Sequence, residues 1–114
     1  MHELAVTENL LEIAIRHGKT AGARRISNLY LVIGQMSSIV DNSVQFYWDI
    51  ISKGTVAEGA KLHFHRTSVE LICKECAHQF IPNGEDLSCP HCGSIQIHVI
   101  SGEEFYLEAI DVET

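Results

Sequence analysis

The chain has 114 residues, enough for one compact domain or for a small domain that carries a metal-stabilised insertion. Its 15 acidic and 8 basic side chains give a formal net charge of −7, which argues against nucleic acid as a partner because phosphate binding depends on clustered Lys and Arg. No apolar run is long enough to cross a bilayer and no signal-peptide pattern opens the chain, so we expect a cytoplasmic protein without a membrane partner.

Two segments have the apolar spacing of amphipathic helices. Between Glu3 and His17 the apolar residues recur at helical intervals, and Gly18 is placed to end that helix. A second helix is expected to follow Asp41-Asn42-Ser43, which offers several capping side chains, and to reach toward Gly54. Its aromatic residues are expected in the core.

Three segments alternate in the manner of β-strands: residues 23–34, 61–69 and 103–112. The last two flank a cysteine-rich stretch, and we expect these two strands to pair and to hold its ends together. The predicted fold is therefore α+β, with a small three-stranded sheet, two helices on one face, and an inserted four-cysteine ribbon.

The inserted stretch contains two Cys-x-x-Cys pairs. Cys73 and Cys76 are separated by twelve residues from Cys89 and Cys92. Two pairs at this separation can place four thiolates at the corners of a tetrahedron, the geometry of structural Zn²⁺ sites. Because a segment this short buries little apolar surface, the metal would supply much of its folding free energy. We interpret the stretch as a zinc ribbon.

Disulfides and a redox dithiol are two alternatives for these cysteines. Disulfides are typical of secreted chains, whereas a thioredoxin-like motif needs one Cys-x-x-Cys beside a βαβ pattern rather than two facing pairs. Catalytic zinc is also disfavoured, because four thiolates leave no position for water. No phosphate-binding Gly-x-x-x-x-Gly-Lys loop is present, and we expect that the protein is not an enzyme.

The first three residues suggest a second metal site. The Met1 amine, the backbone nitrogen of His2 and its imidazole can close fused chelate rings, and Glu3 can supply a fourth ligand. Deprotonated amide nitrogens favour a square-planar ion, Ni²⁺ or Cu²⁺. The alternative is that His2 belongs to a frayed terminus and that Glu3 is an acid suited to the first turn of a helix.

Several features together resemble the hydrogenase maturation nickel-insertion (HypA/HybF) family. They are the opening Met1-His2-Glu3-Leu4, the Gly54-Thr-Val-Ala-Glu-Gly59 turn, and the two Cys-x-x-Cys pairs before a final strand. The resemblance spans nearly the whole chain. It implies a nickel metallochaperone that binds Ni²⁺ through His2 and Glu3, holds Zn²⁺ on the four cysteines, and helps to load nickel into the large subunit of [NiFe] hydrogenase.

The resemblance also implies partner proteins and a division of the chain into two domains with different metals. A nickel-binding GTPase and the hydrogenase large subunit are the implied partners, with urease accessory proteins in some organisms. Residues 1–70 with 101–114 would form the nickel-binding domain and 71–100 the zinc-ribbon domain. In certain relatives an acidic residue after the first strand lies near the nickel, and Asp41 is the nearest candidate for it here. An inserted ribbon could exchange between chains, which makes a homodimer one expected state.

Four other histidines are candidate ligands. His78 and His91 lie beside the ribbon cysteines, and His63 and His65 share one face of a predicted strand. We expect solvated or supporting roles for all four. The competing function is a zinc-ribbon interaction adaptor that transports no metal, for which His2 would be dispensable and every cysteine essential.

Overall fold

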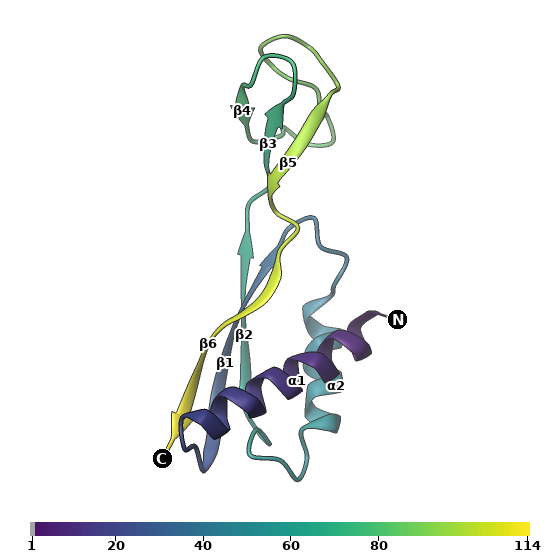
Figure 1. Ribbon diagram of the computed structural model, residues 1–114. Coiled ribbons are helices and arrows are strands. Elements are labelled where there is room, and N and C mark those ends of the chain that lie inside the picture. Colours follow the sequence, from purple (N-terminus) through teal and green to yellow (C-terminus); the bar gives the residue numbers. More distant parts are fainter. Residues whose placement is uncertain (1) are drawn as a thin grey trace. The chain divides into compact units, whose positions relative to one another are not determined.

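The computed structural model describes the backbone of residues 2–114 and the side chains from residue 3 onward. The described residues form two helices and six strands, and the last five strands follow one another without a helix between them (Figure 1). In order they are α1 His2–Thr20, β1 Arg25–Gly34, α2 Asp41–Ile51, β2 Lys61–Thr67, β3 Glu70–Cys73, β4 Gln79–Phe80, β5 Ile97–Ser101 and β6 Phe105–Glu113. The α+β prediction is confirmed, and the three predicted strands end within two residues of β1, β2 and β6.

The chain divides into two compact units. One comprises residues 1–32, 38–65 and 106–114, and the other comprises residues 33–37 and 66–105. The first unit holds both helices and most of the sheet with strand order β2-β1-β6. No helix in residues 2–114 is both long and apolar enough to span a membrane.

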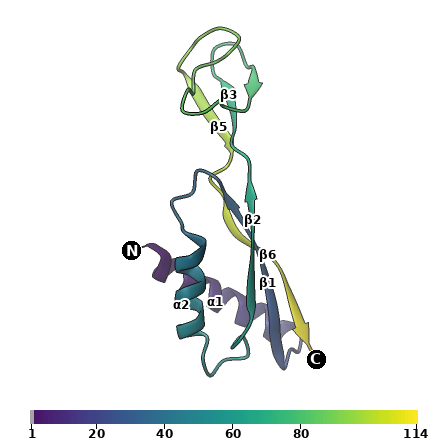
Figure 2. The ribbon, with the colours of Figure 1, turned by 180° about the vertical axis from the view of Figure 1, so that it is seen from behind.

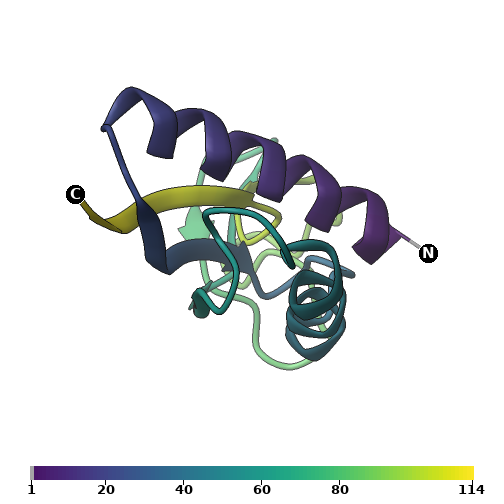
Figure 3. The same cartoon turned by 90° about the horizontal axis from the view of Figure 1, so that it is seen from below.

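The core of the first unit lies between the two helices and β1. Leu10 and Ala14 of α1, Trp48 of α2 and Leu29 and Leu31 of β1 are all almost completely buried. Figure 2 shows α2 from the side opposite to Figure 1, and Figure 3 shows α1 running alongside β6. The expectation that Tyr47 and Trp48 of α2 belong to the core is right for Trp48, which is fully buried, whereas Tyr47 is half-buried. One face of α2 is buried against the core, which accounts for the helical spacing of its apolar residues.

The predicted end of α1 at Gly18 is wrong, because the helix continues to Thr20. A Cβ atom on residue 18 would lie 2.9 Å from the Cδ1 atom of Ile26, so this glycine permits close packing of β1 against the helix. The chain leaves the helix at Gly22, whose φ of +68° is a conformation that glycine adopts readily.

The predicted cap of α2 also differs. Val40 occupies the cap position, and no side chain of its own caps the helix. The backbone N–H of Val40 instead donates to the Glu3 carboxylate at 3.3 Å. A residue remote in sequence therefore supplies the acceptor that Asp41-Asn42-Ser43 were expected to provide.

The strands that flank the ribbon do not pair, contrary to prediction. They lie on either side of β1, which is the central strand. The backbone N–H of Arg24 donates to Glu113 at one end, and that of Gly34 donates to Glu104 at the other, so β1 and β6 run antiparallel. The last four residues of β1, 31–34, are all buried, so both faces of this end of the strand are covered.

The second unit has a sheet that the sequence did not predict. Its strand order is β4-β3-β5, with both pairings antiparallel. Leu71 of β3 faces Phe80 on one side and Val99 on the other. The ends of the ribbon are thus held together by β3 and β5. Strands of two to five residues are too short to show an alternation in the sequence.

Candidate metal centre

Each Cys-x-x-Cys pair lies in a turn of the same construction. The N–H of Cys73 donates to the carbonyl of His78, and the N–H of Ala77 donates back to the carbonyl of Cys73. The second pair repeats the pattern, with Cys89 donating to Ser94 and Gly93 donating to Cys89. These two turns, residues 73–78 and 89–94, are called the knuckles below.

The knuckles bring the four sulfur atoms together. The Sγ atoms of Cys73 and Cys92 are 3.6 Å apart, as are those of Cys76 and Cys89, and all four lie within 4.8 Å of one another. The thiols are not bridged by disulfides. Four thiolates around one zinc ion, each at about 2.3 Å, would be about 3.8 Å apart. The donor set and its spacing therefore fit a tetrahedral ion such as Zn²⁺.

The surroundings of the four thiols lower the pKa of Cys73 and Cys89 and raise that of Cys76 and Cys92. The N–H of Cys76 is the main cause that lowers the pKa of Cys73 to about 7, and burial opposes it. The Ser94 N–H lowers the pKa of Cys92, but the neighbouring thiols and burial outweigh it and raise the pKa to about 12. A cluster that ionises stepwise in this way needs a cation to hold four thiolates at once. The four clustered thiols could therefore hold a metal ion such as Zn²⁺.

Each knuckle contains one histidine, His78 in the first and His91 in the second. The ring of His78 stacks on Phe80 and on His91, with centroid separations of 6.1 and 5.5 Å. The backbone N–H of His91 points at the Cys89 sulfur at 3.4 Å. The backbone of His91 therefore supports the Cys89 thiol, one of the four clustered sulfur ligands.

The other predicted site residues lie in the first unit. The Met1 amine and the His2 side chain lie outside the described part of the chain. The pKa of Glu3 is lowered, first by its own backbone N–H and more weakly by that of Val40. Because Asp41 directly follows Val40, the structure brings the Glu3 carboxylate to the N-terminus of α2, where Asp41 lies.

His63 belongs to a side-chain network across the sheet. Its Nε2 atom lies 2.8 Å from the Asn28 Oδ1 atom, and its ring stacks on Tyr30 with centroids 4.8 Å apart. Asn28 and Tyr30 both donate to the Asp111 carboxylate, at 3.1 and 2.6 Å. His65, two residues further along β2, is exposed.

Among the side chains described, the four cysteines form the one group of three or more His, Cys, Asp or Glu able to share an ion. Gly93, four positions after Cys89, marks the second knuckle in the sequence, but sequence reasoning missed Ala77, which holds the same position after Cys73. Both have positive φ, at 77° for Gly93 and 62° for Ala77, and both close their knuckle. The signal that could have revealed Ala77 is the sixteen-residue offset at which both cysteine pairs and these two small residues repeat.

Comparison with known proteins adds to this picture. The family model described as "Hydrogenase/urease nickel incorporation, metallochaperone, hypA" matches residues 1–112. A hydrogenase maturation factor HypA from Dehalococcoides mccartyi (strain ATCC BAA-2266 / KCTC 15142 / 195) is 42% identical over 113 residues, which cover 99% of this chain and 95% of the relative. One from Caldanaerobacter subterraneus subsp. tengcongensis is 35% identical over 114 residues, covering 99% of this chain and all of the relative.

Two solved structures share the fold. A solution structure of HypA protein has a TM-score of 0.78 at 28% identity and covers 99% of this chain and 97% of its own. The solution structure of the Ni metallochaperone HypA from Helicobacter pylori has a TM-score of 0.72 at 27% identity, with 96% of both chains covered. The chain therefore belongs to the HypA family of hydrogenase and urease nickel-incorporation metallochaperones.

Proposed function

We propose that this protein carries Ni²⁺ at its N-terminus and delivers it to the large subunit of [NiFe] hydrogenase. The family match over residues 1–112 carries this proposal. The ligands would be the Met1 amine, the backbone and imidazole nitrogens of His2, and Glu3. Nickel here is cargo, and a shallow site at a chain end suits a carrier because few groups must move to release the ion.

The position of Glu3 supports a site at this end of α1. Its carboxylate reaches the N-terminus of α2, which brings a second acid, Asp41, into the neighbourhood. The same contact also has a structural role, because the carboxylate accepts from the Val40 N–H. We therefore propose Asp41 as an additional acid near the nickel rather than as a required ligand.

We propose that the four cysteines hold structural Zn²⁺. Residues 71–100 would then form the zinc-ribbon domain, and residues 1–70 together with 101–114 would form the nickel-binding domain. The compact unit that contains the ribbon extends beyond that range on both sides and takes in residues 33–37. The proposed transfer partners are a nickel-binding GTPase, which would supply any GTP hydrolysis, and, for urease maturation, its accessory proteins.

The test is a Ni²⁺ titration of untagged protein beside a copy with extra residues ahead of Met1. Zinc content is measured in both, and His2→Ala is the matched single-residue variant. We expect one zinc in every version, whereas one nickel with a square-planar absorption spectrum should bind only to the native chain. Nickel affinity should fall as pH drops below about 6.5, because protons compete for imidazole.

Equal nickel binding by the native and extended copies would exclude the terminus as the site. If, in addition, neither version transferred nickel to apo-hydrogenase large subunit while each cysteine variant lost partner binding, the chain would act as an adaptor.

A further inference from the structure

β6 lies at an edge of its sheet. Its neighbour on one side is β1, and among the residues described no strand pairs with its other side. The strand is 9 residues long, so it presents a row of backbone N–H and C=O groups along this open edge. An exposed strand edge is a template on which a further extended chain can pair.

A groove of about 350 Å³ lies between β6 and α1. Its lining comprises residues 107–110 and Val112 of β6, with Ile13, His17 and Ala21 from α1 and the turn that follows it. Neighbouring side chains of a strand point to opposite faces, so a groove lined by four consecutive strand residues lies along the edge of the strand rather than over one face. Figure 3 shows α1 alongside β6. This space is called the β6 groove below.

The β6 groove is mostly apolar. Of its lining residues, His17 and Glu108 are polar and the rest are aliphatic. Ile13, His17 and Ala21 follow one another at intervals of four residues, so they continue one face of α1. Because alternate side chains of an extended chain share a face, a strand added to β6 would direct every second side chain toward α1 and into this groove.

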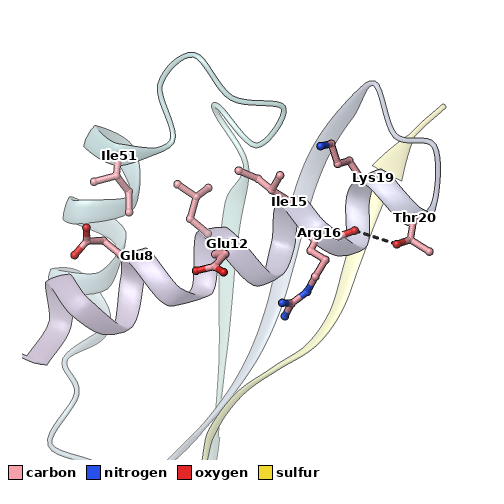
Figure 4. A pocket seen from close by; sticks show the side chains of 8 residues that line it. Glu8, Glu12, Ile15, Arg16, Lys19, Thr20 and Ile51 are labelled. Atoms are coloured by element: carbon pink, nitrogen blue, oxygen red, sulfur yellow. Dashed lines mark hydrogen bonds between the residues drawn. The ribbon is translucent and has the colours of Figure 1, made fainter.

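Another face of α1 carries a larger groove, of about 830 Å³. Figure 4 shows that Glu8, Glu12, Arg16 and Lys19 line it, so charges of both signs lie there. All its lining residues belong to α1 and α2, and it therefore offers no strand edge to a partner. The β6 groove, by contrast, combines an open edge with an apolar lining.

Charge selects the kind of chain that suits this edge. Every charged side chain of β6 is acidic, namely Glu108, Asp111 and Glu113. A second copy that paired through its own β6 would place acids beside acids, which is unfavourable between adjacent strands. Basic side chains would complement these acids instead, and the formal net charge of −7 favours a basic partner as well.

We propose that β6 binds an extended segment of a partner protein, which joins the sheet as a fourth strand. The segment carries apolar side chains at alternate positions, which fill the β6 groove, and Lys or Arg between them. Main-chain hydrogen bonds supply affinity, whereas the groove and the acids of β6 supply specificity. The lining includes neither residues 1–3 nor a cysteine, so this binding is independent of both metals.

An NMR titration of ¹⁵N-labelled protein with a synthetic peptide tests the proposal. The probe is acetyl-Lys-Val-Lys-Val-Lys-Val-Lys-amide, added to about 1 mM. Amide signals of β6 should shift, and hydrogen exchange at its open edge should slow, because the peptide supplies hydrogen-bond partners. A peptide of the same composition with its Val residues consecutive should bind about tenfold more weakly, because its apolar side chains cannot share one face.

N-methylation of the peptide separates strand addition from side-chain contact alone. Successive N–H groups of a strand point to opposite edges, so a chain that pairs with β6 uses alternate ones. One peptide is methylated at the backbone nitrogens of its Val residues and another at those of its internal Lys residues. One of the two should lose binding and the other should keep it. Equal binding by the two would overturn the proposal.

Two variants test the lining of the groove. Ala21→Phe fills it from the α1 side and should weaken binding about tenfold or more. The matched control Ala5→Phe makes the same change at an exposed alanine of α1 outside the groove and should leave binding intact. Circular dichroism checks that both variants are folded.

Glu108→Lys tests the charge preference. It should weaken binding of the Lys peptide about threefold and strengthen binding of a peptide with Glu in place of Lys. Glu85→Lys makes the same charge change at an exposed position outside the groove and should have a smaller effect.

Three further results would overturn the proposal. They are β6 signals that do not respond to about 1 mM peptide, equal binding of the alternating and reordered peptides, and an Ala21→Phe variant that binds like Ala5→Phe. Protection of the β6 edge that rises with protein concentration and resists the peptide would show that a second copy covers it, which also contradicts the proposal. None of these results depends on nickel, so they leave the carrier proposal to its own test.

Discussion

At the scale of single residues, Ala77 holds an unusual backbone conformation. Among the residues described it is the one non-glycine residue with positive φ, and Gly93 takes its place in the other knuckle. An L-residue in the left-handed region costs roughly 1–2 kcal/mol. Its N–H donates to the carbonyl of Cys73, and this hydrogen bond closes the knuckle and offsets part of that cost.

Ala77→Gly should therefore stabilise the ribbon by about 1 kcal/mol, less the entropy that glycine adds to the unfolded chain. Gly93→Ala should destabilise it by a similar amount, because a Cβ atom there meets nothing within 4 Å and only backbone strain is added. Chemical denaturation of the zinc-loaded protein measures both. Equal stability of the two variants would show that the knuckles are not equivalent.

Tyr30 titrates abnormally because it donates to a carboxylate. The hydrogen bond to Asp111 is the main cause that raises the pKa of Tyr30. A raised folded pKa means that the stabilisation is fully present below the unfolded value of about 10 and is lost as pH rises through the folded value. We expect Asp111→Asn to lower the Tyr30 pKa, as measured by ultraviolet titration with Tyr30→Phe subtracted. An unchanged titration would mean that the hydrogen bond does not persist in solution.

At the scale of elements, two glycines allow backbones to cross in the second unit. A Cβ atom on Gly34, the last residue of β1, would lie 2.0 Å from the carbonyl carbon and oxygen of Gly102. The Gly102 N–H in turn donates to the Glu104 carboxylate, whose pKa is lowered first by its own backbone N–H and then by that of Gly102. Glycine is needed at position 34 for space rather than for its φ.

Gly34→Ala should consequently destabilise the protein by about 3 kcal/mol or more, since neither backbone can move away without breaking sheet hydrogen bonds. Gly84→Ala is the control: its φ is +66° but its Cβ would meet nothing within 4 Å, so about 1 kcal/mol should be lost. Thermal unfolding compares the two. Similar melting temperatures would show that the crossing relaxes easily.

At the scale of the whole molecule, the two units depend on different sources of stability. The first unit buries a continuous core that includes Trp48, the single tryptophan of the chain. The ribbon has three short strands, and we expect it to depend on a metal ion bound by its four cysteines. Loss of the metal should therefore affect the ribbon and spare the first unit.

Removal of the metal by a chelator, or Cys92→Ser, should unfold the ribbon and leave the first unit folded. Trp48 fluorescence should then keep its buried emission while amide protons in residues 71–100 exchange fast. Cys76→Ser should behave in the same way, because every thiolate is required. A simultaneous loss of Trp48 burial would mean that both units unfold together.

The sequence by itself determined the chemistry of this protein. Cysteine spacing predicted one four-sulfur cluster, because ligand number and separation are local properties of a short loop. Helical and alternating patterns likewise located α1, α2 and the three long strands, since each period reports which side of one element is buried. The opening Met-His-Glu with the two cysteine pairs was enough to suggest the family that the comparison then established.

Tertiary structure decided what depends on residues far apart in the chain. The sequence did not reveal that β1 lies between the strands flanking the ribbon, because strand order depends on pairing between segments far apart in the chain. Gly34 likewise owes its place to the backbone of Gly102, which is remote in sequence, and Gly18 to the side chain of Ile26. Glu3 reaches the N-terminus of α2 across 37 positions. Short-range patterns record which residues are buried, whereas only packing in three dimensions determines what they are buried against.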